Sequence, residues 1–128
     1  MNIFKIGDTD FGIGEVVLKI DSEKDIISDM TITGKEEVYK QITSDENGYW
    51  RLSTQYPPKI YLRGVPLNGN VIEITDELLD EYDIALYFME HNDVHGTLTI
   101  NEKCIAIKGE VNLWGEIRPL EIIAEYVR

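Results

Sequence analysis

Two histidines within five residues are the first candidates for chemistry in this chain. They are His91 and His95, and Asp93 lies between them. Two imidazoles and a carboxylate at this spacing have the donor types that bind zinc or another transition metal, and they also suit acid–base catalysis. Asn92, Asp93 and Gly96 are turn-forming residues, however. We therefore predict a hairpin connection here, with solvated side chains and no metal site.

The chain contains one cysteine, Cys104. A nucleophilic thiol needs a base and a group that orients this base, and the spacing around Cys104 supplies neither. We predict an unreactive thiol in a strand, and no internal disulfide. The single cysteine suits a reducing compartment. Because no catalytic or cofactor-binding motif occurs elsewhere in the sequence, we predict that the protein is not an enzyme and holds no cofactor.

Aromatic side chains could form a platform for a sugar or for a protein partner. The candidates are Tyr49, Trp50, Tyr61 and Trp114, with Arg63 as a neighbouring cation. Trp114 shares its predicted strand face with Glu110 and Asn112, which are polar. We therefore predict that Trp114 is exposed and contacts a partner.

Acidic residues dominate the segment between Arg63 and Lys103. These 39 residues contain no lysine or arginine but nine acids, whereas the rest of the chain holds 15 acids and 12 bases. We predict that most of the nine belong to one partner-binding surface, together with Trp114. The predicted surface consists of Glu73, Asp76, Glu77, Asp80, Glu81, Asp83, Glu90 and Asp93; the ninth acid is Glu102.

A short helix is predicted over residues 75–83, in the centre of this segment. Thr75 can cap it, and Leu78, Leu79 and Tyr82 share one face. The acids on the helix repel one another at the i,i+4 pairs 76/80 and 77/81, at about 0.2–0.5 kcal/mol each. The acids at its C-terminal end also oppose the helix dipole. A local rule that is broken without visible compensation often marks a functional surface.

The elements that must position these residues are mostly strands. Isoleucine occurs 18 times and alanine 3 times, and apolar residues alternate with polar ones along most of the chain. Strands are predicted at 2–7, 11–21, 26–33, 49–55, 59–65, 84–91, 95–101, 103–114 and 119–127. We therefore predict one domain over residues 1–128, a mainly antiparallel β-sandwich or half-open β-barrel with one short helix.

The overall charge limits the kinds of partner. The formal net charge is −12 and the pI is about 4.4, which argues against binding to nucleic acid or to anionic lipid. The first residues lack the apolar stretch of a secretory signal, and no apolar run approaches the roughly 20 residues of a membrane span. We expect a cytoplasmic protein without membrane contact. The sequence leaves the oligomeric state open.

A concentrated acidic surface attracts a basic partner and accelerates their encounter. In size, charge and lack of catalytic motifs, but in no motif, the chain resembles the small acidic immunity proteins that neutralise bacterial nuclease toxins. We hypothesise a non-enzymatic cytosolic protein of this kind, which covers the basic active site of a toxin. The alternatives are a small-ligand or carbohydrate-binding β module and a phage-encoded mimic of nucleic acid. An enzyme built on His91 and His95 ranks last.

Overall fold

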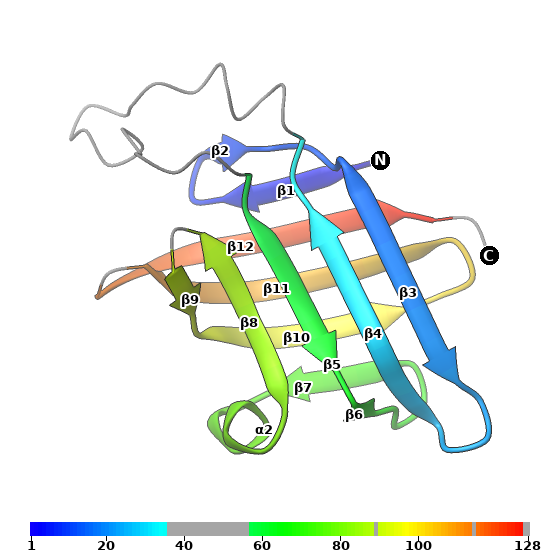
Figure 1. Cartoon of the computed structure of the whole chain (residues 1–128). Coiled ribbons are helices and arrows are strands. Elements are labelled where there is room, and N and C mark those ends of the chain that lie inside the picture. Colours follow the sequence, from blue (N-terminus) through cyan, green and yellow to red (C-terminus); the bar gives the residue numbers. More distant parts are fainter. Residues whose placement is uncertain (36–56, 89, 114, 127–128) are drawn as a thin grey trace.

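The computed structural model describes residues 1–35, 57–88, 90–113 and 115–126. It contains two antiparallel sheets, which pack face to face (Figure 1). In sheet A the strands lie in the order β2-β1-β12-β11-β10-β7. Their bounds are β1 Ile3–Ile6, β2 Thr9–Asp10, β7 Val71–Ile74, β10 Val94–Ile100, β11 Cys104–Leu113 and β12 Glu116–Glu125.

Sheet B has the strand order β3-β4-β5-β8-β9, and the short strand β6 pairs with β4. The bounds are β3 Glu15–Asp21, β4 Ile26–Thr33, β5 Lys59–Arg63, β6 Val65–Pro66, β8 Asp83–Phe88 and β9 Glu90–Asn92. The strands of sheet B cross those of sheet A at a steep angle (Figure 1). The predicted class, an antiparallel β-sandwich with one short helix, is confirmed over the described residues.

The alternating apolar residues of both sheets form one core. Phe4, Leu98 and Ile122 of sheet A and Ile32 and Leu86 of sheet B belong to a single cluster of buried side chains. Because successive residues of a strand point to opposite faces, each strand places every second side chain in this core. The remaining side chains point outward and form the two outer faces of the sandwich.

After β7 the chain passes twice between the sheets. The helix α2 (Asp76–Glu81) joins β7 at the edge of sheet A to β8 of sheet B. Asp93 then joins β9 of sheet B to β10 of sheet A. Figure 1 shows α2 at one end of the sandwich, beside β7 and the start of β8. These two crossings decide which of the acidic residues come together.

Several predicted boundaries are wrong for local reasons. The strand predicted at 11–21 begins only at Glu15, since Gly12 adopts a φ of +69°. The strand predicted at 84–91 is two antiparallel strands, β8 and β9, and Asn92 ends the second. Strand β12 begins at Glu116 rather than 119, because a tight turn at Gly115 places Glu116 opposite Leu113.

Other sequence predictions fared differently. The strands β2 and β7, of two and four residues, were not predicted. The strand predicted at 59–65 is β5 and the first residue of β6, which are separated at Gly64, where φ is +72°. The predicted strand at 49–55 lies outside the described residues, as do Tyr49, Trp50 and Trp114.

Candidate functional site

The helix α2 begins where the sequence predicts. The hydroxyl of Thr75 accepts a hydrogen bond from the backbone N–H of Leu78 at 3.3 Å, which caps the first turn. Leu78, Leu79 and Tyr82 pack against the core, so the acids of the helix face solvent. The helix ends at Glu81, two residues earlier than predicted, and Asp83 is the first residue of β8.

Six of the predicted acids gather around this helix, and we call this group the acidic end. Strand β7 contributes one, α2 four and the start of β8 one: Glu73, Asp76, Glu77, Asp80, Glu81 and Asp83. All six residues are exposed. The short span β7–α2–β8 therefore concentrates the charge at one end of the sandwich (Figure 1).

The other two predicted acids lie elsewhere. Strand β8 has six residues and separates Asp83 at its start from Glu90, which pairs with Phe88 at the opposite end of the strand. Asp93 follows β9 directly, at the crossing into sheet A. The structure therefore does not bring Glu90 and Asp93 into the acidic end, although the sequence predicts one surface for all eight acids.

Half of the acidic end has partners within the chain. The Asp76 carboxylate lies 2.5 Å from Nε2 of His95, and Thr97 donates a hydrogen bond to Glu73 at 2.9 Å. Asp83 forms an ion pair with Arg63 at 3.3 Å. The sequence shows no compensation for the acids of the predicted helix 75–83, but two of them, Asp76 and Asp83, have a partner in the structure. Their partners lie on other strands, where sequence spacing does not reveal them.

The other half consists of Glu77, Asp80 and Glu81, all on the helix. No hydrogen bond or ion pair of their side chains occurs among the described residues. The repulsive pairs Asp76/Asp80 and Glu77/Glu81 both lie within the observed helix, whose last turn contains no base. These three carboxylates are the part of the acidic end that no internal contact explains.

The two histidines do not share a site. His91 lies on β9 in sheet B and His95 on β10 in sheet A, so the predicted hairpin connection is wrong. Asn92 resembles a turn residue, but it is buried, and its amide donates hydrogen bonds to the carbonyls of Leu86 and Glu90 at 3.2 and 2.9 Å. Within the described ranges, no three His, Cys, Asp or Glu side chains are grouped as a metal site requires.

Gly96, the other apparent turn residue, lies within a strand. Its φ is +155° and it pairs with Gly109 of β11. A Cβ added to Gly96 would lie only 2.7 Å from the Cα of Gly109. The absence of a side chain at Gly96 therefore allows β10 and β11 to approach closely, next to His95.

Aromatic and basic side chains meet on the outer side of sheet B, and we call this group the aromatic face. It consists of Lys59, Tyr61, Arg63, Tyr87 and His91. The His91 ring packs edge-on against Tyr87 and Tyr61, with centroids 5.1 and 6.1 Å apart. The Arg63 guanidinium lies 4.6 Å from the centroid of Tyr61, and the Lys59 amine 5.9 Å from that of Tyr87. Of the predicted aromatic platform, the described residues retain Tyr61 and Arg63.

The strand register explains why sequence analysis missed Tyr87 and His91. Lys59 pairs with Tyr87, and Tyr87 pairs with His91, across β5, β8 and β9. The sequence did offer one signal: Asp83, Ala85 and Tyr87 are two residues apart, so in a strand they share one face. Burial raises the pKa of the Tyr61 hydroxyl, and the Asp83 carboxylate raises it further, while Arg63 opposes both. A groove of about 550 Å³ lies beside this face, with Lys59 and Tyr87 in its lining.

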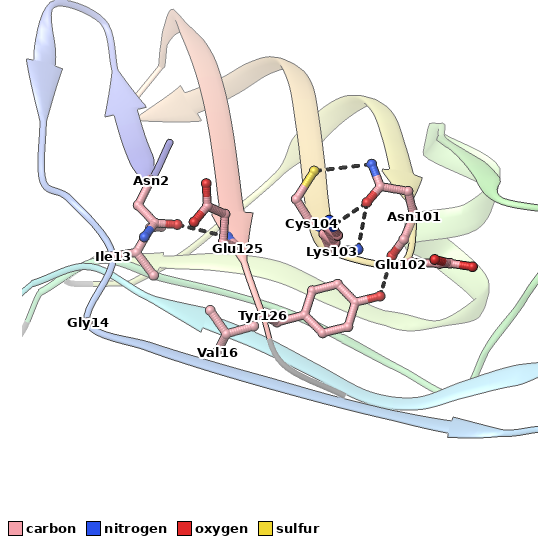
Figure 2. Close-up of a pocket in the computed structure, with 10 residues that line it drawn as sticks. All are labelled: Asn2, Ile13, Gly14, Val16, Asn101, Glu102, Lys103, Cys104, Glu125 and Tyr126. Carbon is pink, nitrogen blue, oxygen red and sulfur yellow. Dashed lines mark hydrogen bonds between the residues drawn. The ribbon is translucent and has the colours of Figure 1, made fainter.

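A larger groove, of about 1360 Å³, lies at the opposite edge of sheet B (Figure 2). It runs between the start of β3 and the end of sheet A, where Tyr126 and the β10–β11 turn contribute side chains. The Tyr126 hydroxyl donates a hydrogen bond to the carbonyl of Asn101, and the Asn101 amide lies 3.2 Å from the sulfur of Cys104. Cys104 is half-buried in β11, as predicted for a thiol in a strand.

One structural finding and three comparisons with known proteins complete the description of the site. None of the helices in the described ranges has the length and apolar character to cross a membrane. No known protein-family model, curated protein sequence or solved structure matches this chain.

Proposed function

We propose that this chain is a non-enzymatic binding protein whose acidic end docks on a basic protein. The observation that carries the proposal is the set of carboxylates on Glu77, Asp80 and Glu81. They lie exposed on one short helix and have no partner in the described part of the chain. Their mutual repulsion lowers the stability of this helix. Cations of a basic partner would attract these carboxylates and offset their mutual repulsion.

The kind of partner follows from the spacing of charge. Several carboxylates on one exposed helix resemble a row of phosphates in sign and density, so they suit a protein that binds nucleic acid. We propose a nuclease-type toxin as the partner and cytoplasmic neutralisation of this toxin as the function, as in immunity proteins. A phage-encoded mimic of nucleic acid would use the same acidic end.

The test removes charge in two places. In the first variant, Glu77→Gln, Asp80→Asn and Glu81→Gln neutralise the helix. The control variant Glu23→Gln, Glu102→Gln and Glu110→Gln removes the same charge from exposed positions outside the acidic end. Each protein is immobilised and used to capture basic proteins from a cell lysate. The captured protein is then assayed for nuclease activity with and without added wild-type chain.

The proposal predicts that wild type and control capture the same basic nuclease, and that the helix variant loses it. Added chain should inhibit the captured nuclease, and binding should weaken as salt rises, since the screening length is only about 8 Å at 0.15 M. Equal capture by all three proteins would show that the acids are only solvated surface.

A second candidate function is binding of a small ligand such as a sugar. The aromatic face and its groove of about 550 Å³ favour it, because ring faces beside polar side chains suit such ligands. Chemical-shift titration with a panel of mono- and oligosaccharides tests this function. Binding that Tyr87→Ala abolishes would favour the ligand over the protein partner.

A further inference from the structure

Strand β3 has one unpaired side. It pairs with β4, and no strand of the described residues lies on its other side. The pairing is regular over Glu15–Lys19, and a bulge follows between Lys19 and Ile20. Backbone N–H and C=O groups along such an edge are a template for another strand. The regular stretch is therefore the part of β3 that can accept a partner.

The sequence of this stretch is complementary to itself. It reads Glu15-Val16-Val17-Leu18-Lys19, with opposite charges at its two ends. When two copies pair antiparallel around Val17, Glu15 of each lies opposite Lys19 of the other. Opposite charges directly across a strand pair are stabilising. The two copies then form two equivalent ion pairs, as twofold symmetry requires.

Only one register gives this match. A shift of two residues in one direction places Glu15 opposite Asp21, and a shift in the other direction places it opposite Val17. The first repels, and the second leaves the charges unpaired. Odd shifts would move the inward side chains to the outer face. The charge pattern therefore selects the arrangement centred on Val17.

The inner side of the edge suits the same arrangement. Val16 and Leu18 are only partly buried and pack against the core from its rim. In the Val17-centred register, Val16 of each copy lies opposite Leu18 of the other. The groove of about 1360 Å³ runs beside this edge, and Ile13, Val16 and Tyr126 line it (Figure 2). Apolar side chains of a second copy would thus enter an open, partly apolar space.

We propose that two copies of this chain associate through β3, antiparallel and centred on Val17, so that sheet B continues from one copy into the other. A seam of one strand pair is smaller than the roughly 1,200 Å² at the low end of stable interfaces. The dimer is therefore weak and depends on concentration. This association uses neither the acidic end nor a toxin partner, so it is independent of the function proposed above.

Charge exchange tests the register. Sedimentation equilibrium of wild type between about 10 and 500 µM should show a reversible monomer–dimer equilibrium. Glu15→Lys alone, or Lys19→Glu alone, places like charges opposite each other twice and should weaken the dimer about tenfold or more. The double variant Glu15→Lys/Lys19→Glu restores both pairs and should dimerise like wild type. Both residues are exposed, and circular dichroism checks that each variant is folded.

Cross-linking tests the same contact directly. Val17→Cys, made with Cys104→Ser, places two thiols opposite each other, at the Cα separation of about 4.5–5.5 Å that a disulfide accepts. Mild oxidation should give a covalent dimer. The control Thr31→Cys lies in the same row, paired with Val17 but one strand inward, and should remain monomeric.

Two results would overturn the proposal. One is a monomer at every concentration, which would mean that the end of sheet A blocks the edge of β3 or that the edge takes a different extended chain. The other is a dimer that neither single charge reversal weakens, which would place the contact elsewhere on the molecule.

Discussion

The acidic end and the aromatic face both lie at the surface, but they hold their charges differently. On the aromatic face, Arg63 contacts Asp83, Asp29 and the ring of Tyr61 at once. At the acidic end, three of six carboxylates have no partner among the described residues. The first arrangement uses charge to order the sheet surface. In the second, three carboxylates make no such contact, which is why we propose that the acidic end binds a partner.

The largest expected effect concerns the strand pair that supports the acidic end. A Cβ on Gly109 would overlap the backbone carbonyl of His95, whose side chain contacts Asp76. The two nearest atoms, the carbonyl oxygen of His95 and the Cα of Gly96, belong to the backbone and cannot rotate away as a side chain can. Gly109→Ala should therefore lower the free energy of unfolding by about 3 kcal/mol. Urea denaturation measures this loss. The control Gly69→Ala meets no atom within 4 Å and should cost less, through its φ of +69° alone. Equal losses would contradict the close approach.

The next effect concerns the aromatic face. Arg63→Ala removes two ion pairs, at 3.3 and 3.8 Å, and a cation–π contact. Because the Arg63 side chain is half-exposed, each contact is screened, and we expect a total loss of about 1 kcal/mol. Thermal and urea unfolding measure it. Lys5→Ala, at an exposed base of β1 without an ion pair in the described ranges, should change stability by less than about 0.5 kcal/mol. If Arg63→Ala left the stability unchanged, the charges of the aromatic face would contribute no more to the fold than those of the acidic end.

A smaller effect of opposite sign is expected at the acidic end. Asp80→Lys replaces the repulsion of Asp76 with attraction and puts a base near the helix C-terminus. The free energy of unfolding should rise by about 0.5 kcal/mol, because both changes favour the helix. The same substitution should weaken binding to a basic partner. Destabilisation by Asp80→Lys would mean that Asp80 has a structural contact, and the charge of the acidic end would then serve the fold.

The smallest effect is a pH dependence on the aromatic face. Burial and Asp83 raise the pKa of Tyr61 above its ordinary value of 10.0, so the unfolded chain releases this proton at a lower pH than the folded chain. The corresponding stability is complete below about pH 10 and is lost as the pH rises through the folded pKa. Tyr61→Phe should flatten the alkaline decline, measured by urea unfolding from roughly pH 8 to pH 11. Parallel curves for the two proteins would contradict the raised pKa.

The sequence predicted the fold class well because the relevant signals are local. Alternation of apolar residues marked β4, β10 and β11 to within about one residue, since side chains of a strand alternate strictly between faces. Thr75 marked the start of α2, because an N-cap hydroxyl acts on its own first turn. Local signals failed at Asn92 and Gly96, which are residue types common in turns. In the structure the Asn92 amide is buried and hydrogen-bonded, and Gly96 allows two strands to approach closely.

The candidate site was predictable in its residues but not in its contacts. The sequence by itself determined that nine acids without a base occupy residues 64–102, and it predicted a short helix over 75–83 for five of them, of which the observed helix holds four. Only the tertiary structure decided that Asp76 meets His95, that Asp83 meets Arg63, and that Glu90 lies at the far end of β8. The reason is physical. Charge and periodicity are properties of the residues themselves, whereas contacts between strands depend on strand order and register, which the packing of the whole core selects.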